Sequence, residues 1–346
     1  MLYIYTATLR CILKKKKKKI TKFLLFFFLT RPRLERGPVE SSFALKKISR
    51  IMAFEATLGQ GEIFKKIIFA IVDLVQDGNF ECDSDGIRLQ AMDTSHVSLV
   101  SLFLNKDSFD NYKCETPITL GINFQSLTKV LKCSKMDDSL HLSTDPSSKD
   151  ELSIVFSDKN DRRTSTFQLK LMEIDSERLV IPETNYVCEI VMSSKEFKQI
   201  MTDLHNIGES LTIGGSKEGV RFAITGEIGS GDLTYRNSDA VIPIKKKKSK
   251  KHSDDGQSQT QSVQDDKDLV IECEDDTTSG SHVKIQCEQA VTQNFALKYL
   301  VSFTKGTTLS PLVHLSMSPD IPLVVRFDIE TLGYLKYYLA PKIDDE

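Results

Sequence analysis

The sequence repeats itself at one constant offset, and this repeat limits the possible folds more than any other feature. Phe64–Ile67 aligns with Phe197–Ile200, and Asp85–Leu89 aligns with Glu218–Phe222, without a gap between the two matches. Each copy has apolar residues at helical spacing, followed by strand-like segments around a turn glycine. Two copies of one such pattern predict two similar domains. A chain of 346 residues is also longer than one hydrophobic core usually serves.

Strand and helix patterns alternate through most of the chain, which predicts an α+β fold. Phe54–Leu58 is a predicted strand, and Gly61–Leu74 is a predicted helix because its apolar residues recur at spacings of three and four. We expect one domain over residues 52–171 and a second over 186–346. Residues 172–185 are polar with isolated apolar positions and include a proline, which predicts a connector between the domains.

Two segments do not fit the domain pattern. Residues 1–51 include the lysine run Lys14–Lys19, and we expect them to be an unstructured extension or translated upstream sequence. Residues 243–267 combine the basic run Lys245–Lys251 with a Ser/Gln/Asp tract, and they are predicted to be a disordered insertion. The basic run fits a nuclear localisation signal, a DNA contact or a solvated loop equally well.

Charge is distributed unevenly along the chain. Residues 1–51 hold 14 of the 46 Lys and Arg but only two of the 48 Asp and Glu, which leaves 32 basic and 46 acidic residues in 52–346. The body is therefore acidic, although the formal net charge of the whole chain is only -2. An acidic protein binds nucleic acid only if its basic residues gather on one surface, so the positions of the lysines matter more than their number.

The cysteines and histidines predict neither a metal site nor an active site. Seven cysteines at wide spacings, without a C-x-x-C, are expected to be reduced thiols: Cys11, Cys82, Cys114, Cys133, Cys188, Cys273 and Cys287. We find no phosphate-binding loop, zinc-protease motif or nucleophile elbow. A hydrolase using His96 beside Asp93 and Ser95 stays an alternative, although catalytic triads normally assemble from distant positions. No cofactor is predicted.

Lysines recur on the polar sides of four predicted short helices. Because lysines commonly fill exposed helix faces, this pattern alone proves little. If the four helices line one surface, however, the lysines form a basic patch on an acidic protein. The candidates for such a DNA-facing surface are Lys65, Lys66, Lys129, Lys132, Lys198, Lys298 and Lys305.

Several longer strings resemble the proliferating cell nuclear antigen family of eukaryotic DNA sliding clamps. They are Leu89–Val100, Leu169–Met172, Ile321–Val325 and Gly333–Ile343, and the resemblance covers Met52–Glu346. It implies a clamp fold of two similar domains and a ring of three identical chains around duplex DNA. The strand near 166–171 would then pair with the strand near 228–235 of the next chain. In that ring the lysines would line the hole, and Gln199 and Thr202 stand where the family usually has basic residues.

The resemblance also implies a binding surface for partner proteins. DNA polymerases, the clamp loader, flap endonuclease and ligase would bring short motifs with a glutamine and paired aromatic residues. The corresponding positions here are Met92, His96, Val97, Leu99, Leu179, Ile181, Pro322, Tyr338, Leu339, Ala340 and Pro341. Leu99 is the position most easily explained as a core residue.

The resemblance further implies a nuclear protein of DNA replication, repair and translesion synthesis, with no enzyme activity and no membrane attachment. Lys217 corresponds to the family lysine that receives ubiquitin or its relatives. A related reading is a checkpoint-type subunit that forms a ring only with two different chains. Self-assembly would distinguish that subunit from a clamp of three identical chains.

Overall fold

A computed structural model of the protein describes residues 54–145, 148–160, 162–175, 179–181, 184–237 and 283–342. The predicted extension 1–51 and the predicted insertion 243–267 lie outside these ranges, so both remain expectations from sequence. Within the described residues, no helix is long and apolar enough to cross a lipid bilayer.

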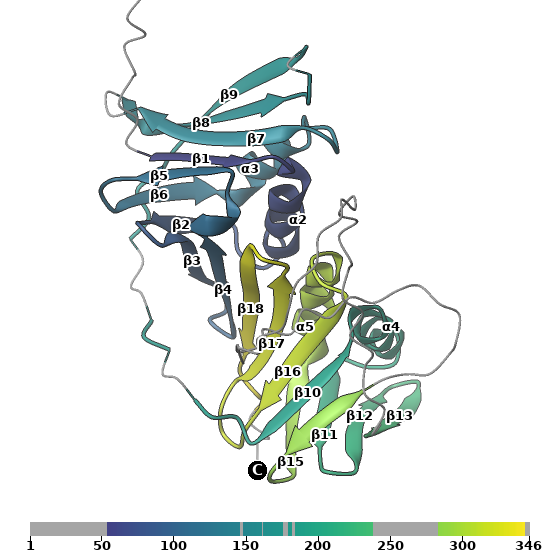
Figure 1. Ribbon diagram of the computed structural model, residues 1–346. Coiled ribbons are helices and arrows are strands. Elements are labelled where there is room, and N and C mark those ends of the chain that lie inside the picture. Colours follow the sequence, from purple (N-terminus) through teal and green to yellow (C-terminus); the bar gives the residue numbers. More distant parts are fainter. Residues whose placement is uncertain are drawn as a thin grey trace, which may run out of the picture. The chain divides into compact units, whose positions relative to one another are not determined.

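The chain forms two successive sets of strands and short helices (Figure 1). The first set comprises β1 (Phe54–Leu58), α2 (Gly61–Ile71), β2 (Asp77–Cys82), β3 (Gly86–Met92), β4 (Ser98–Asn105), η1 (Lys106–Ser108), β5 (Asn111–Cys114), β6 (Ile118–Asn123), α3 (Phe124–Leu131), β7 (Ser139–Asp145), β8 (Ser148–Ser157) and β9 (Thr164–Lys170). The second comprises β10 (Cys188–Ser193), α4 (Ser194–His205), β11 (Ser210–Gly215), β12 (Gly219–Gly226), β13 (Gly229–Arg236), β14 (Lys284–Cys287), β15 (Val291–Ala296), α5 (Leu297–Phe303), η2 (Thr304–Thr308), β16 (Leu312–Met317), β17 (Leu323–Ile329) and β18 (Gly333–Leu339).

The second set repeats the order of the first. The starts of α2 and α4, at Gly61 and Ser194, are separated by the same offset as the starts of β3 and β12, at Gly86 and Gly219. The strands β5 and β6 before α3 likewise correspond to β14 and β15 before α5. The predicted α+β fold of two similar domains is therefore confirmed. The boundaries that we assign to the domains and the connector stay predictions.

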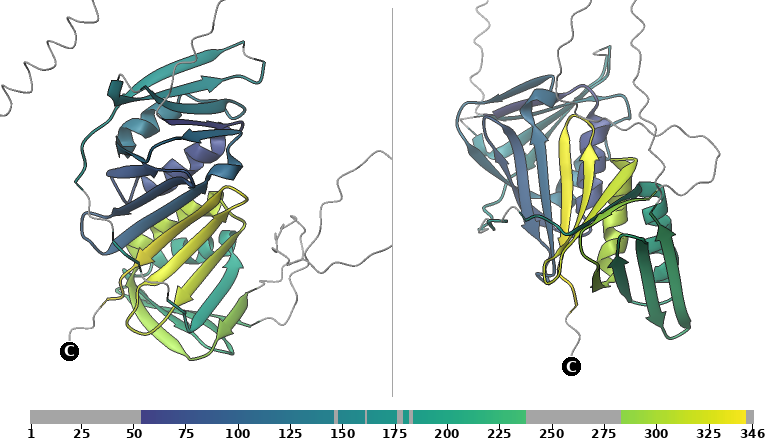
Figure 2. Two further views of the ribbon diagram at one scale, coloured as in Figure 1. Left: turned by 60° about the vertical axis from the view of Figure 1, so that its left-hand side comes forward. Right: turned by 60° about the horizontal axis from the view of Figure 1, so that its bottom comes forward.

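Three antiparallel sheets carry the fold. Their strand orders are β5-β1-β7-β8-β9, β14-β10-β16-β17-β18-β4-β3-β2-β6 and β13-β12-β11-β15. The nine-stranded sheet takes strands from both halves, because β4 of the first half pairs with β18 of the second. The two domains thus share one continuous sheet, visible in Figure 2 (left) with the helices behind its strands.

The helices form where one apolar stripe can be buried against the sheets. α2 buries Phe64, Ile67, Ile68 and Ile71, whose spacing places them on one face. α4 buries the corresponding stripe Phe197–Leu204. Each fully buried large side chain contributes about 1.5–3 kcal/mol relative to an exposed one. The opposite face of α4 is exposed, whereas the lysines on the opposite face of α2 are half-buried.

The expectation that all cysteines are reduced is wrong for one pair. Cys188 and Cys287 are joined in a disulfide, with their Cα atoms 4.1 Å apart. The bond forms because β10 and β14 place the two residues directly opposite each other. Cys82, Cys114 and Cys133 are free thiols. A separation of 99 residues hid this pairing in the sequence.

Candidate functional site

The helices contact one another in a single layer, which we call the helix layer. α2 contacts α3 on one side and α5 with η2 on the other, and α4 contacts α5 and η2. This order brings together four lysine-bearing segments that lie far apart in the sequence, from Lys65 to Lys305. α3 begins at a defined point because the Asn123 side chain accepts a hydrogen bond from the Ser126 amide at 2.8 Å.

The predicted lysines differ in how far neighbouring groups already engage them. Lys65 lies 3.6 Å from the Glu62 carboxylate and donates to the Ser134 carbonyl at 3.4 Å. Lys305 pairs with Asp73. The ammonium groups of Lys132 and Lys298 lie 5.9 and 4.9 Å from the ring centroids of Phe69 and Tyr299. These four lysines are therefore partly compensated within the chain.

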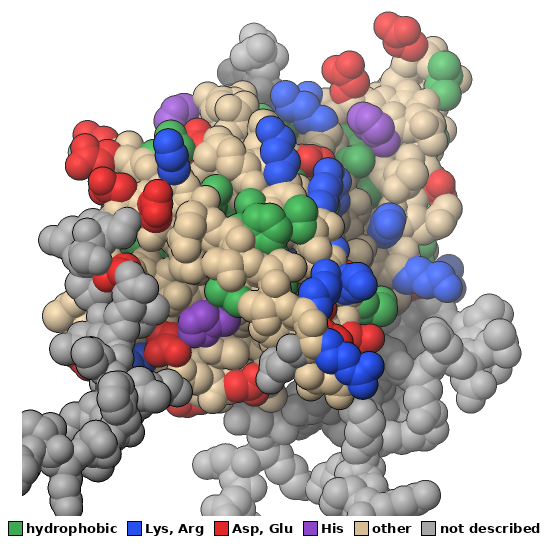
Figure 3. All heavy atoms as spheres, turned by 90° about the horizontal axis from the view of Figure 1, so that it is seen from above, with side chains coloured by type: hydrophobic (Ala, Val, Ile, Leu, Met, Phe, Trp, Pro, Cys, Tyr) green, Lys and Arg blue, Asp and Glu red, His purple; other side chains and the backbone are tan. Residues whose placement is uncertain are grey.

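Three of the predicted lysines have neither an ion-pair partner nor an aromatic ring beside the ammonium among the described residues: Lys66 on α2, Lys129 on α3 and Lys198 on α4. Lys129 and Lys198 are exposed, and Lys66 is half-buried. Seen from the β7–β9 end, the Lys and Arg side chains lie mainly on one half of the drawn face (Figure 3). A free, exposed ammonium can bind a phosphate without first breaking an internal pair.

α4 carries a weaker positive charge than a row of lysines would give. Gln199 donates to both carboxylate oxygens of Asp203, at 2.9 and 3.0 Å. The Thr202 hydroxyl donates to the Lys198 carbonyl at 2.8 Å. The two neutral residues noted in the sequence are thus occupied by local hydrogen bonds, and beside them Lys198 has no ion-pair partner among the described residues.

The connector lies along the strands of the first half. The Met172 amide donates to the Gly121 carbonyl at 2.9 Å, and the Asn79 side chain donates to the Ile174 carbonyl at 2.9 Å. Further along, the Gln90 side chain both donates to the Leu179 carbonyl and accepts from the Leu179 amide, at 2.9 and 2.7 Å. These bonds leave the Leu179 side chain exposed beside β3.

Four apolar side chains lie in one row across β3, β4, β18 and β17. The strand register pairs Met92 with Leu99, Leu99 with Tyr338, and Tyr338 with Val324. Directly opposed residues point to the same face, so these four side chains form what we call the apolar row. Met92 is 37% exposed and the neighbouring Leu179 is 44% exposed. An exposed apolar surface of this kind is suited to binding the apolar side chains of a peptide.

The alternation along β18 corrects one predicted contact residue. Leu339 is paired with Ser98 and Leu323, its side chain is fully buried, and it points to the face opposite Tyr338. Its side chain therefore belongs to the core and is not available to a bound peptide. Leu99 lies in the apolar row but is 8% exposed, so it supports the row from below.

The remaining predicted partner residues border the apolar row. The chain after β18 is held by a hydrogen bond from the Ala340 amide to the Val97 carbonyl at 3.0 Å. His96 and Pro322 are exposed, and the others are half-buried: Val97, Ile181, Ala340 and Pro341. Sequence reasoning missed two residues near this surface. Val180 in the connector is 92% exposed. Gln90 lies two residues before Met92 on a predicted strand, and this spacing could have indicated that both side chains share one face.

Tyr338 contributes a polar tip to the apolar row. Burial raises the pKa of its hydroxyl to about 12, with smaller contributions from nearby Tyr186 and Tyr334. The hydroxyl therefore stays protonated at neutral pH and can donate a hydrogen bond. Tyr186, at the end of the connector, is a further neighbour that the sequence did not single out.

Asp93, Ser95 and His96 form a loop support rather than a catalytic group. The buried Asp93 carboxylate accepts from the amides of Ser95, Val97 and Ser98 at 2.9, 2.9 and 2.6 Å, and from the Tyr299 hydroxyl at 3.2 Å. Burial alone would raise its pKa, but these hydrogen bonds outweigh burial and lower it. The carboxylate is engaged by these donors, and among the described residues it makes no hydrogen bond or ion pair with the His96 ring, so the three residues do not form a catalytic triad.

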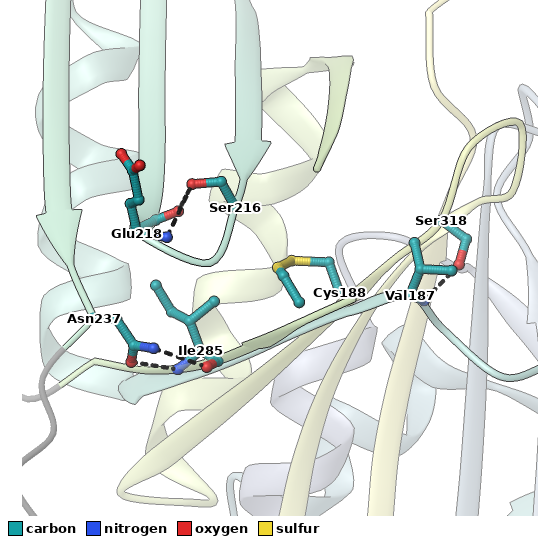
Figure 4. The surroundings of a disulfide bond; sticks show 9 residues. Val187, Cys188, Ser216, Glu218, Asn237, Ile285 and Ser318 are labelled. Carbon is teal, nitrogen blue, oxygen red and sulfur yellow. Dashed lines mark hydrogen bonds between the residues drawn. A yellow bond between two sulfur atoms is a disulfide. The ribbon is translucent and has the colours of Figure 1, made fainter. Parts of the chain in front are cut away.

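Lys217 lies in the tight turn between β11 and β12. The Ser216 amide donates to the Gly219 carbonyl at 2.9 Å, and the Glu218 amide donates to the Ser216 hydroxyl at 3.3 Å (Figure 4). The side chain of Lys217 is exposed. The turn thus presents a free amine to solvent on a fixed backbone.

Among the described strands, the three sheets end in six edge strands: β5, β9, β14, β6, β13 and β15. Short links along the chain join β5 to β6 and β14 to β15, from one sheet to the next, so β9 and β13 are the two edges without such a link. β9 and β13 have a neighbour on one side only and alternate between exposed and half-buried side chains. An open edge of this length is a template for pairing with another chain.

Comparison with protein families gives two matches that together cover most of the chain. The model described as the N-terminal domain of proliferating cell nuclear antigen matches residues 53–178. The model described as the C-terminal domain of the same family matches residues 180–248 and 236–342. The two matches meet within the connector.

Proposed function

Because the chain belongs to the proliferating cell nuclear antigen family, we propose that three copies of it close into a ring around duplex DNA. The family is one of sliding clamps that act in DNA replication as processivity factors, and it is not a family of enzymes. The ring, its contact with DNA and its partners are our proposal. It rests on the open strand edges, the helix layer and the apolar row.

The open edges carry this proposal. β9 and β18 are each the last strand of their half, while β4 and β13 each follow the strand pair after the first helix. Within the chain, β4 already pairs with β18. Pairing β13 of one copy with β9 of the next would therefore repeat the junction that joins the two domains. Such a head-to-tail contact must close into a ring or form a filament.

The helix layer would face the DNA in this ring. Its free lysines contact phosphates, which are the same for every sequence, so the clamp would bind DNA without reading bases. The contacts are few and individually weak, so the ring can slide while its closed topology keeps it on the duplex. Residues 52–346 have more acidic than basic residues, so the outer surface of the ring would repel DNA. The attraction for DNA would therefore be limited to the hole.

The apolar row would receive the clients. A motif with paired aromatic residues would place its rings against Met92 and Leu179, and its glutamine would bond to backbone near the chain end after β18. DNA polymerases, the clamp loader, flap endonuclease and ligase would share this surface in turn. We further propose that the protein acts in the nucleus, in repair and translesion synthesis as well as replication. Modification of Lys217 would serve damage tolerance, which Lys217→Arg should impair.

Solution mass tests the ring. The full chain, and the chain from Met52, should each show the mass of three copies by light scattering and hold it across a dilution series. Replacing Phe167 on β9 by aspartate should lower that mass, while the same change at the exposed Met136 should not. A chain that stays monomeric at every concentration would contradict the homotrimer and favour a subunit that needs two different partners.

A further inference from the structure

The disulfide joins two strands and lies against a third, and the proposed ring function does not use this bond. Cys188, labelled in Figure 4, is the first residue of β10 and follows shortly after the connector, and Cys287 is the last residue of β14. Both side chains are buried. Gly215, at the end of β11, approaches the Cys188 sulfur so closely that no Cβ would fit between them. The turn with Lys217 begins at the next residue.

β14 has few hydrogen-bonding neighbours, although Ile285 and Cys287 are buried in the core. It has four residues, lies at the edge of the nine-stranded sheet and pairs with β10 alone. Within the described part of the chain, it also makes two 3.1 Å hydrogen bonds between the Asn237 side chain and the backbone of Ile285, and the adjacent Glu288 amide donates to the Val187 carbonyl. Among the described residues, the disulfide is the only covalent cross-link between β14 and β10, and it spans a separation of 99 residues.

One of the two cysteines lines a surface hollow. Residues 184–187 and Glu189 line it from one side, and Gln286, Cys287 and Glu288 line it from the other. Cys188 does not line this hollow. A small thiol entering it would therefore reach Cys287, and the two glutamates would favour a cationic or neutral thiol over an anionic one.

We propose that the Cys188–Cys287 bond is a reversible redox clasp, opened and closed by small thiols at Cys287. A thiolate attacks the Cys287 sulfur, the S–S bond breaks, and Cys188 leaves as a thiolate that takes up a proton. A second thiolate attacks the mixed disulfide and releases Cys287 as a thiolate, which also takes up a proton. Two electrons and two protons pass to the protein, and two molecules of the small thiol become its disulfide. The disulfide of the small thiol drives the reverse reaction.

Closing the clasp should stabilise the protein, because the bond restricts the unfolded chain over a long loop. We expect the oxidised form to melt about 5 °C above the reduced form. Cys287→Ser should melt near the reduced wild type in either buffer. Cys133→Ser, which removes an exposed free thiol, should keep the full redox-dependent difference.

The decisive measurement is the linked fraction of the full chain in glutathione buffers of graded redox ratio. After each equilibration, free thiols are alkylated in denaturant and the peptide containing both cysteines is quantified by mass spectrometry. A linked fraction that moves from above nine-tenths to below one-tenth across the series supports the clasp. A bond that never forms overturns the proposal, and one that persists at every ratio shows a permanent structural disulfide instead.

The route of access has its own test. At equal thiolate concentration, cationic cysteamine should open the bond at least threefold faster than anionic glutathione, and Glu189→Gln with Glu288→Gln should reduce that advantage. Equal rates for the two thiols in the wild type would show that attack does not pass through the acidic hollow.

Discussion

At the scale of single residues, Asp93 joins the two domains through one carboxylate. Its oxygens organise the loop 93–98 in the first half and accept the Tyr299 hydroxyl from α5 in the second. Asp93→Asn keeps the size of the side chain but replaces one accepting oxygen by an NH2 group, which cannot accept hydrogen bonds from the backbone amides. We expect it to lower the free energy of unfolding by about 2–3 kcal/mol at pH 7, measured by chemical denaturation.

The pH dependence of this effect separates charge from packing. The folded pKa of Asp93 lies below its ordinary value, so its contribution is complete above the unfolded pKa near ~4 and is lost as the pH falls through the folded pKa. The stability gap between wild type and Asp93→Asn should therefore shrink below about pH 4. Tyr299→Phe, which removes one donor only, should cost less. A gap that is constant with pH would disprove the electrostatic account.

Single residues also show where sequence reasoning reached its limit. The string around Asp93 marked a candidate functional region, but the sequence also allowed its carboxylate to be part of a triad, which its backbone partners argue against. Leu339 was placed in the partner surface because the family string marks the segment, whereas the strand register decides which face each residue occupies. The Cys188–Cys287 pair depends on two strands meeting, and no local pattern encodes that meeting.

At the scale of elements, the connector is held near the apolar row by Gln90. Gln90→Ala removes two hydrogen bonds to Leu179 at a largely exposed position, so the loss of global stability should stay below about 1 kcal/mol. Amide hydrogen exchange at Leu179 should nevertheless become much faster, because local opening no longer breaks those bonds. Affinity for a Gln/aromatic client peptide should fall roughly threefold to tenfold through the less ordered surface.

A matched change on another element controls for the loss of a glutamine. Gln199→Ala on α4 also removes two side-chain hydrogen bonds, but they are local to the helix. It should alter neither the exchange of Leu179 nor peptide affinity. If Gln90→Ala leaves the exchange rate at Leu179 unchanged, the connector is held by other contacts.

Hydrogen bonds connect the two chain segments that flank the predicted insertion. The Asn237 side chain, before the insertion, donates to the carbonyl and accepts from the amide of Ile285, after it. Deleting residues 243–267 should therefore leave the assembled mass unchanged and the melting temperature within about 2 °C, since loop length costs little. Asn237→Ala should lower melting by roughly 2–4 °C, because it removes both hydrogen bonds. Weaker assembly of the deletion variant would show that the insertion supports the neighbouring strand β13.

Element types were largely predictable, because burial imposes a period that the sequence displays. The helix expected over Gly61–Leu74 is present as α2, but it ends at Ile71, where Leu74 and Val75 turn back to bond the Ile71 carbonyl. The internal repeat located the second copy of helix and strands. The nine-stranded sheet was not predictable, because β4 and β18 come from different halves of the chain. Nothing in the local sequence of either strand specifies its partner.

At the scale of the whole molecule, function depends on where charge is left uncompensated. The body of the chain is acidic, yet the helix layer presents lysines from four segments. Their local partners rank them: Lys65 and Lys305 already form ion pairs, whereas Lys66, Lys129 and Lys198 have none among the described residues. A phosphate must displace a carboxylate in the first group but only water in the second. The free lysines should therefore dominate the salt-dependent part of DNA binding.

This ranking leads to a prediction for the assembled protein on short duplex DNA. Replacing Lys66, Lys129 and Lys198 by alanine should reduce the slope of log affinity against log salt by about 0.9 for each lysine that contacts a phosphate. The double change Lys65→Ala with Lys305→Ala should have a smaller effect per residue, and Lys217→Ala, outside the helix layer, should have none. The slopes would be measured by fluorescence anisotropy across a salt series. An equal loss for Lys217→Ala would mean that DNA contacts the outer surface, whereas an unchanged slope in the triple variant would remove the helix layer from DNA binding.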